Sequence, residues 1–151
     1  MDTKAMQIEN MTLTITEEIQ VRATLEATFA AILEQIGPSH ELEPGKPLPM
    51  IIEPWPGGRW FRDLGNENGH CWGHVQSIKK WGLLEISGPL MMSYPTMSSI
   101  QYRLTEKDGG TLIKFHHMAF GLLQDGHKAG FPPIWKHVNG GVKARAESIR
   151  G

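Results

Sequence analysis

The side chains best suited to chemistry in this chain lie in two short stretches that contain histidine. The first is His70-Cys71-Trp72-Gly73-His74, and the second is His116-His117. Imidazole and thiolate groups bind zinc, and imidazole is also a general acid or base near neutral pH. The spacing of these residues therefore decides between a metal centre, an acid–base site and ordinary structural roles.

The spacing of His70, Cys71 and His74 argues against a metal centre. On a strand, His70 and His74 share one face and Cys71 points to the other, because successive side chains alternate. No fourth ligand stands nearby in the sequence, whereas a closed zinc site needs four converging ligands. We therefore expect no metal ion here, and solvated or hydrogen-bonded side chains instead.

His116 and His117 are adjacent on a predicted strand, so they point to opposite faces. Ile113 and Phe115 share the parity of His117, which indicates that His117 faces inward. An inward histidine can bind a ligand, act as a base, or be a satisfied core side chain bonded to a neighbouring element. No partner carboxylate is visible, so catalysis is the least favoured of the three, and we predict no catalytic residue.

The segment from Glu53 to Arg62 must bend the sheet that carries these residues. It reads Glu-Pro-Trp-Pro-Gly-Gly-Arg-Trp-Phe-Arg and follows an apolar run. Proline cannot donate to a sheet ladder, and the Gly-Gly pair permits backbone angles that other residues avoid. A sheet that curves around another element needs such a bend. Glu53 and Arg59 flank it and are placed to pair.

Alternation and helical spacing divide the chain into a strand, a helix, further strands and a final helix. From Leu13 to Val21 apolar and polar residues alternate as in a half-buried strand, with a bulge or end effect expected at Glu17. Thr24 caps a helix that Gly37-Pro38 ends. Further strands are predicted at about 50–54, 58–64, 70–78, 82–87, 98–105 and 111–118.

Two proline- or glycine-rich stretches, 38–49 and 119–131, are predicted to be loops. Pro132-Pro133 then starts the last helix, because proline suits the first helical turn. Its apolar stripe consists of Ile134, Val138, Val142 and Ile149. Gly140-Gly141 inside this helix costs roughly 1 kcal/mol per glycine relative to alanine, so close packing or room for a ligand should compensate.

Four weak motifs, taken in order over most of the chain, resemble the SRPBCC or START-like superfamily. More narrowly, they resemble proteins akin to the activator of the 90-kDa heat-shock protein ATPase. The motifs are Glu53-x-x-x-Gly57-Gly58, Trp72-Gly73-His74-Val75, a Gly109-Gly110-Thr111 hairpin whose strand runs through His117 to Phe120, and Trp135 near the start of the last helix. The resemblance implies an α+β helix-grip fold, in which a curved antiparallel sheet wraps around a long C-terminal helix and a short helix follows the first strand. It implies one domain over 11–151 behind a polar segment, 1–10.

The resemblance also implies a cavity between the sheet and the last helix. The expected lining residues are Trp60, Tyr102, Ile113, Phe115, His117, Trp135, Val138, Gly141 and Val142. Over such a cavity Gly141 should face the sheet. Met91, Met92, Met97 and Met118 either line an adaptable apolar pocket or fill gaps in the core.

Composition excludes several classes of function. The chain has 151 residues and a formal net charge of −1, which argues against nucleic-acid binding and against a polybasic membrane surface. It shows no signal peptide and no apolar run long enough to span a membrane. The single Cys71 allows no intramolecular disulfide and fits a reducing cytoplasm.

Three functions from different classes stay open. The favoured one is the binding of a small apolar or amphipathic molecule, without a cofactor. The second is a protein-interaction module that modulates a chaperone ATPase, as the resemblance suggests. The third is a cyclase- or hydratase-like enzyme with His117 or Tyr102 as acid or base; the absence of nucleophile-elbow, P-loop, dinucleotide and His-Glu-x-x-His motifs weakens it.

Overall fold

A computed structural model describes residues 7–149 of the chain. In chain order its elements are a 3-10 helix (Ile8–Asn10), β1 (Thr12–Val21), α1 (Leu25–Ile36), β2 (Glu41–Glu43), β3 (Lys46–Pro47), β4 (Ile51–Ile52), β5 (Arg59–Gly65), β6 (Asn68–Lys79), β7 (Leu83–Gly88), β8 (Thr96–Lys107), β9 (Gly110–Gly121) and α2 (Asp125–Ser148). Seven strands form one antiparallel sheet in the order β1-β9-β8-β7-β6-β5-β4, and β2 and β3 form a separate hairpin.

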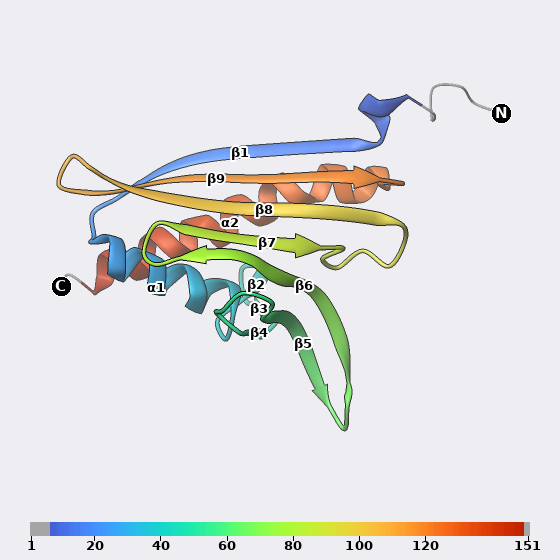
Figure 1. The fold of residues 1–151 in the computed structure, drawn as a ribbon, viewed down its shortest axis with the longest axis horizontal. Helices are drawn as coiled ribbons and strands as arrows, with labels where there is room; N and C mark the ends of the chain where they lie inside the picture. Colours follow the sequence, from blue (N-terminus) through green and yellow to red (C-terminus); the bar gives the residue numbers. More distant parts are fainter. Residues whose placement is uncertain (1–6, 150–151) are drawn as a thin grey trace.

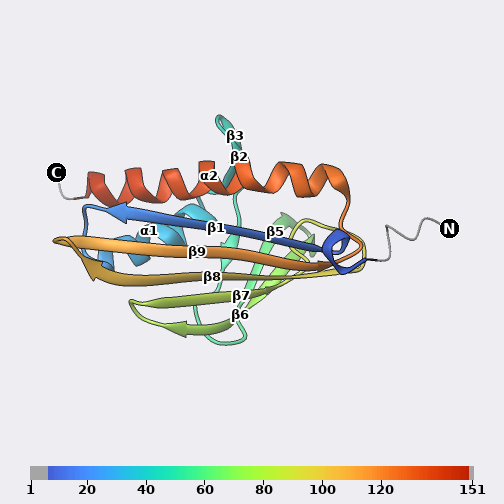
Figure 2. The ribbon, with the colours of Figure 1, turned by 90° about the horizontal axis from the view of Figure 1, so that it is seen from above.

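The helix α2 lies behind the sheet in Figure 1 and runs along one side of it in Figure 2, with α1 packed beside it. One apolar core fills the space between these layers. The predicted helix-grip architecture, a curved antiparallel sheet with a long C-terminal helix and a short helix after the first strand, is confirmed.

The pairing of β1 with β9 corrects the expectation for Glu17. The two strands pair without a register shift from Thr12↔Phe120 to Val21↔Thr111, so there is no bulge at Glu17. Its half-buried side chain accepts a hydrogen bond from Asn139 Nδ2 at 3.0 Å. A carboxylate can therefore occupy an inward position, because α2 supplies its donor.

The bend predicted between Glu53 and Arg59 lies between β4 and β5. A Cβ atom on Gly58 would stand 1.9 Å from the carbonyl oxygen of Glu53, so only glycine fits there. Arg59 closes the bend with two bonds of 2.8 Å to the Glu53 carboxylate, and its hydrogen bonds lower the pKa of Glu53 to about 2. Beyond the bend, the β5–β6 hairpin curves away from the other strands (Figure 1).

Both predicted loops contain regular structure. Within 38–49, β2 and β3 pair around a turn in which Gly45 has a φ of 77°. Within 119–131, β9 continues to Gly121 and α2 already begins at Asp125. The residues before Pro132 turn helical because Phe131 is buried against the core and because His127 N and Lys128 N both donate to Gln124 O. The prediction that Pro132-Pro133 starts the helix was therefore wrong.

The stripe of α2 is largely as predicted, with one exception. Val138 and Val142 are buried and Ile134 is partly buried, but Ile149 is 63% exposed and lies beyond the helix. Ala146 occupies the last buried position of the stripe instead.

Gly141 faces α1, and not the sheet as expected. A Cβ atom on Gly141 would stand 2.8 Å from Cδ of Gln35, a buried side chain of α1. A Cβ atom on Gly140 would meet nothing within 4 Å. Gly141 therefore allows the close contact between α1 and α2, while Gly140 lies on an open surface.

Two further expectations concern the polar start of the chain and membrane-spanning segments. The polar segment 1–10 lies mostly outside the described residues, and within it residues 8–10 form a 3-10 helix. Within residues 7–149, neither helix is both long and apolar enough to cross a membrane.

Candidate functional site

Most of the predicted lining residues meet in the interface between the sheet and α2. Strand alternation turns Tyr102 of β8 and Phe115 and His117 of β9 inward, and helical spacing turns Trp135 of α2 toward them. Their ring centroids are close: 4.9 Å for Tyr102–Phe115, 4.7 Å for Phe115–Trp135 and 5.8 Å for His117–Trp135. Ile113, Val138 and Val142 are buried in the same core. We call Tyr102, Phe115, His117 and Trp135 the interface ring cluster.

His117 faces inward, as predicted, and both of its ring nitrogens have partners. Trp135 Nε1 donates to Nδ1 at 2.9 Å, and Nε2 lies 2.9 Å from Ser98 Oγ. Because Nδ1 accepts, the proton of the neutral ring is assigned to Nε2, which then donates to Ser98. Burial, helped by neighbouring His116, lowers the pKa of His117 to about 4. In this arrangement His117 cannot take the proton of Ser98, so the pair is not an activated serine nucleophile.

Tyr102 belongs to a second hydrogen-bonded chain. Its hydroxyl donates to Asn139 Oδ1 at 2.7 Å, and Asn139 Nδ2 donates to Glu17 Oε1. Burial, and then the charge of Glu17, raise the pKa of the Tyr102 phenol. A phenol of this kind stays neutral and is a poor general base. The hydrogen bonds from Tyr102 through Asn139 to Glu17 therefore chiefly fix α2 against β8 and β1.

Ser98 and Asn139 are interface residues that the sequence reasoning missed. The signal was present, because Ser98 shares the inward parity of Ile100 and Tyr102. Asn139 stands next to Val138 at the edge of the buried stripe. A polar residue at an inward position of a strand or helix is therefore a candidate for the interface.

Trp60 is buried as predicted, but its ring contacts belong to a separate group. Its ring lies 5.2 Å from Trp72 and 6.1 Å from His40, and Trp72 lies 5.6 Å from His40. Trp60 Nε1 donates to the carbonyl of Ile36 at the end of α1. We call His40, Trp60 and Trp72 the His40 cluster. Burial lowers the pKa of His40 to about 4, against smaller opposing effects of the Leu48 backbone and Glu41.

The stretch from His70 to His74 forms no cluster of ligands. Cys71 and His74 are exposed, and the ring of His70 packs on Trp72 at 6.5 Å. Within residues 7–149, no three histidine, cysteine, aspartate or glutamate side chains stand close enough to hold a metal ion.

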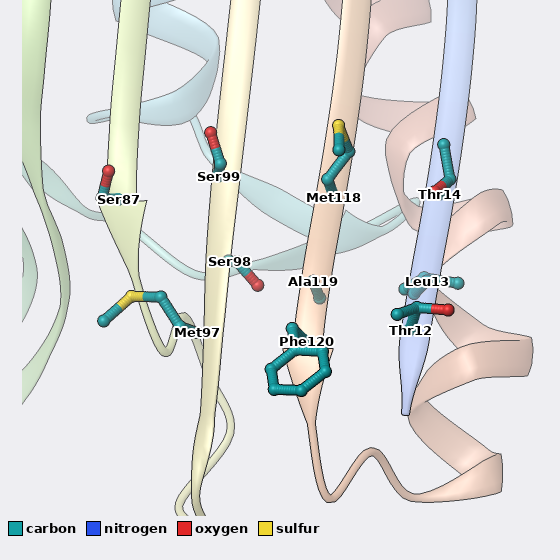
Figure 3. Close-up of a pocket in the computed structure, with 10 residues that line it drawn as sticks. All are labelled: Thr12, Leu13, Thr14, Ser87, Met97, Ser98, Ser99, Met118, Ala119 and Phe120. Atoms are coloured by element: carbon teal, nitrogen blue, oxygen red, sulfur yellow. The ribbon is translucent and has the colours of Figure 1, made fainter. Parts of the chain in front are cut away.

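An apolar groove of about 480 Å³ lies on the outer face of the sheet, over the ends of β1, β8 and β9 (Figure 3). Alternation sends Met118 and Phe120 outward from β9, and Met97 outward from β8 beside Phe120. Met97 and Phe120 are 58% and 54% exposed. Of the four methionines considered from the sequence, Met97 and Met118 line this groove, and Met92 is buried in the core.

Comparison with known proteins gives matches only among solved structures: no protein-family model matches the chain, and no curated protein matches it. The Aha1 dimer of Colwellia psychrerythraea is similar with a TM-score of 0.66 at 15% identity, over 92% of this chain and 99% of that one. Ara h 8.0201 is similar with a TM-score of 0.65 at 14% identity, over 91% of this chain and 99% of that one. The di-domain ARO/CYC protein StfQ from the steffimycin biosynthetic pathway is similar at 0.63 and 10% identity, over 95% of this chain and 53% of that one.

These likenesses concern the architecture. The chain has a helix-grip fold like that of these structures, which confirms the fold that the four sequence motifs implied. At identities of 10–15% the likenesses establish the fold, and they do not assign a ligand.

Proposed function

We propose that this protein binds a small apolar or amphipathic molecule between the sheet and α2. The supporting observation is the make-up of that interface, where the interface ring cluster is hydrogen-bonded to two buried polar side chains, Ser98 and Asn139. Small-molecule sites are largely apolar and aromatic, with a small number of well-placed polar groups. The exposed, unpaired Cys71 leads us to keep the cytoplasm as the proposed compartment.

The loop between β7 and β8, residues 89–95, is the proposed gate of this site. Tyr94 ties the loop to the start of α2, since its hydroxyl lies 2.7 Å from His127 Nδ1 and accepts from Gln124 N at 3.1 Å. Leu90 is buried with a φ of 58°, a region that leucine rarely adopts. Strained residues of this kind cluster at ligand clamps. Because the interface rings already touch one another, a ligand gains access only when this loop or α2 moves.

Native mass spectrometry of the protein purified from cells, followed by thermal-shift screening of aromatic, alicyclic and fatty-acid compounds, tests the proposal. A retained small molecule, or a compound that raises the melting midpoint in a saturable way, is expected. Tyr94→Phe should speed ligand association and dissociation, because it removes both hydrogen bonds that tie the 89–95 loop to the start of α2. A protein that carries no small molecule and that no compound stabilises would contradict the proposal.

The outer groove favours a second function, a protein-interaction module. Met97, Met118 and Phe120 expose apolar surface there, and exposed apolar patches often mark contacts with other proteins. One similar structure is described as a dimer of Aha1, which makes self-association or chaperone contact the partners to examine. Met118→Ser combined with Phe120→Ser should abolish such an interaction and leave interior ligand binding unchanged. Sedimentation of the protein alone tests self-association, and ATPase assays with a 90-kDa heat-shock protein test chaperone contact. A monomeric protein that does not change the ATPase rate would contradict this second function.

A further inference from the structure

β1 is an outer strand of the sheet, and the backbone groups along its free side are open. β1 pairs only with β9 (Figure 1). In an antiparallel pair, alternate residues bond the neighbouring strand and the residues between them point away from it. Gly121 N donates to Met11 O, so the odd-numbered residues of β1 bond β9. Thr14, Thr16 and Glu18 are exposed, and no hydrogen bond among the described residues reaches their outward backbone groups.

Side chains of α2 protect only the last part of this free side. Lys143 Nζ donates to Gln20 O at 2.6 Å, and Glu147 Oε2 accepts from Arg22 N at 2.9 Å. Both bonds agree with an outward direction of the even-numbered residues. Nearer the middle of β1, a groove of about 370 Å³ separates the strand from α2. Gly140 lines this groove, and a Cβ atom on it would meet nothing within 4 Å. The helix therefore leaves room beside the strand.

β1 lacks most of the features that keep an edge strand from pairing with another chain. Native edge strands are short or bulged, or they carry proline or lysine. β1 has ten residues without proline or lysine, and it pairs with β9 without a register shift. Its inward charge, Glu17, is bonded to Asn139 and is held in the interface with α2. The edge is therefore suited to strand addition, in which backbone hydrogen bonds join two chains.

We propose that β1 pairs antiparallel with β1 of a second copy of this chain, about a two-fold axis at Thr16. In this register Thr16 lies opposite Thr16 of the second copy, and Thr14 lies opposite Glu18. The open N–H groups of each strand then meet the open C=O groups of the other. The contact goes beyond both functions proposed above, because it needs neither the interior nor the apolar side chains of β8 and β9 in the outer groove.

The side chains of this pairing are also self-complementary, which favours a second copy as the partner. Opposite residues across an antiparallel pair interact directly, and like charges there are destabilising. Glu17 lies opposite Ile15 of the second copy, so no two carboxylates face each other. Leu13 lies opposite Ile19 and forms an apolar pair on the inner face. Gln20, whose carbonyl Lys143 already binds, falls at the margin of the contact.

Sedimentation equilibrium from micromolar to millimolar protein concentration tests the inference. The wild type should show a monomer–dimer equilibrium, and a weak one, since a single pair of strands buries little surface. Thr16→Pro should weaken dimerisation by about 10-fold or more, because each copy loses the N–H that donates across the axis. Proline is tolerated at an edge position whose N–H faces outward. Thr16→Ala keeps the N–H and is the matched control, so it should dimerise like the wild type.

The outcomes separate this inference from the proposed functions. Met118→Ser combined with Phe120→Ser should leave the strand-paired dimer intact. A dimer that this double change abolishes, and that Thr16→Pro keeps, would place the contact in the outer groove and overturn the inference while the second function stands. A wild type that stays monomeric at every concentration also overturns the inference, and it leaves interior ligand binding untouched.

Amide hydrogen exchange of the wild type decides if Thr16→Pro does not fold. The N–H groups of Thr14, Thr16 and Glu18 must become protected as the protein concentration rises. The N–H of Ile15 bonds β9 and should be protected at every concentration, which makes it the internal control. Exchange at the three edge positions that does not depend on concentration would overturn the inference.

Discussion

Two buried histidines, His40 and His117, should make the stability of this protein depend on pH in a defined window. Burial lowers the pKa of each to about 4, whereas an unfolded histidine titrates near 6.5. As pH falls, the unfolded state therefore takes up protons first, and stability is lost between about pH 6.5 and pH 4. Between pH 7 and pH 5 each histidine should cost about 2 kcal/mol of unfolding free energy.

Urea unfolding at pH 7 and pH 5 measures this loss. Glu53 and Glu147, whose pKa values are lowered to about 2, titrate in the folded state well below this window. His40→Phe should retain roughly half of the wild-type pH dependence. An unchanged pH dependence in that variant would show that His40 is not buried in its neutral form.

The chain from Tyr102 through Asn139 to Glu17 gives a second prediction at the level of residues. Tyr102→Phe removes the hydroxyl and leaves the buried Oδ1 of Asn139 without its donor. We expect a loss of about 1–3 kcal/mol in unfolding free energy. Asn139→Leu combined with Tyr102→Phe removes both partners and should cost less than the sum of the two single changes. Additive losses would mean that the hydrogen bond contributes nothing.

The alternation of residues along the strands predicted which side chains point inward, but it did not predict their hydrogen-bond partners. Alternation along the strands was enough to turn His117 and Tyr102 toward the core. Their partners Ser98 and Asn139 come from other elements, at sequence separations of 19 and 37 residues. Hydrogen bonds between distant elements depend on how those elements pack, which no local pattern contains. The burial of His40 could not be predicted, because this residue lies between two prolines in a segment that was predicted to be a loop.

At the scale of elements, the two glycines of α2 form a matched pair for a stability test. Gly140→Ala should stabilise the protein by about 0.5–1 kcal/mol, because alanine favours the helix and its Cβ meets open space. Gly141→Ala should gain less or lose stability, because its Cβ would press on Gln35 of α1. Thermal unfolding of both variants checks the order. A larger gain at Gly141 than at Gly140 would contradict the observed contact between α1 and α2.

The strands were easier to predict from the sequence than the start of the last helix. Alternation extends over most of β8 and β9, and the turn between them has Asp108 and Gly109 at positive φ, as a tight hairpin requires. The start of α2 was misplaced because proline favours the first turn of a helix. The turn before Pro132 forms through Phe131, which is buried in the tertiary structure. Tertiary packing therefore decided the boundary.

At the scale of the whole molecule, the sequence and the structure agree on the helix-grip fold. The four sequence motifs mark the bend, two strands and the last helix, which are the parts that define a helix-grip architecture. At identities of 10–15%, most aligned residues differ between this chain and the similar structures. The proposed binding site therefore depends on this chain's own interior, where aromatic rings from the sheet and α2 meet with few polar groups.

The most direct test of the central claim uses the indole signals of the five tryptophans in an NMR titration with the most stabilising compound of the thermal-shift screen. Trp60, Trp72 and Trp135 lie in the two interior clusters, while Trp55 and Trp81 are 55% and 37% exposed and serve as internal controls. If the protein binds ligands between sheet and helix, the signals of the three interior tryptophans shift in a saturable way and those of Trp55 and Trp81 stay in place. Shifts confined to Trp55 and Trp81, or no shift at all, would contradict the account.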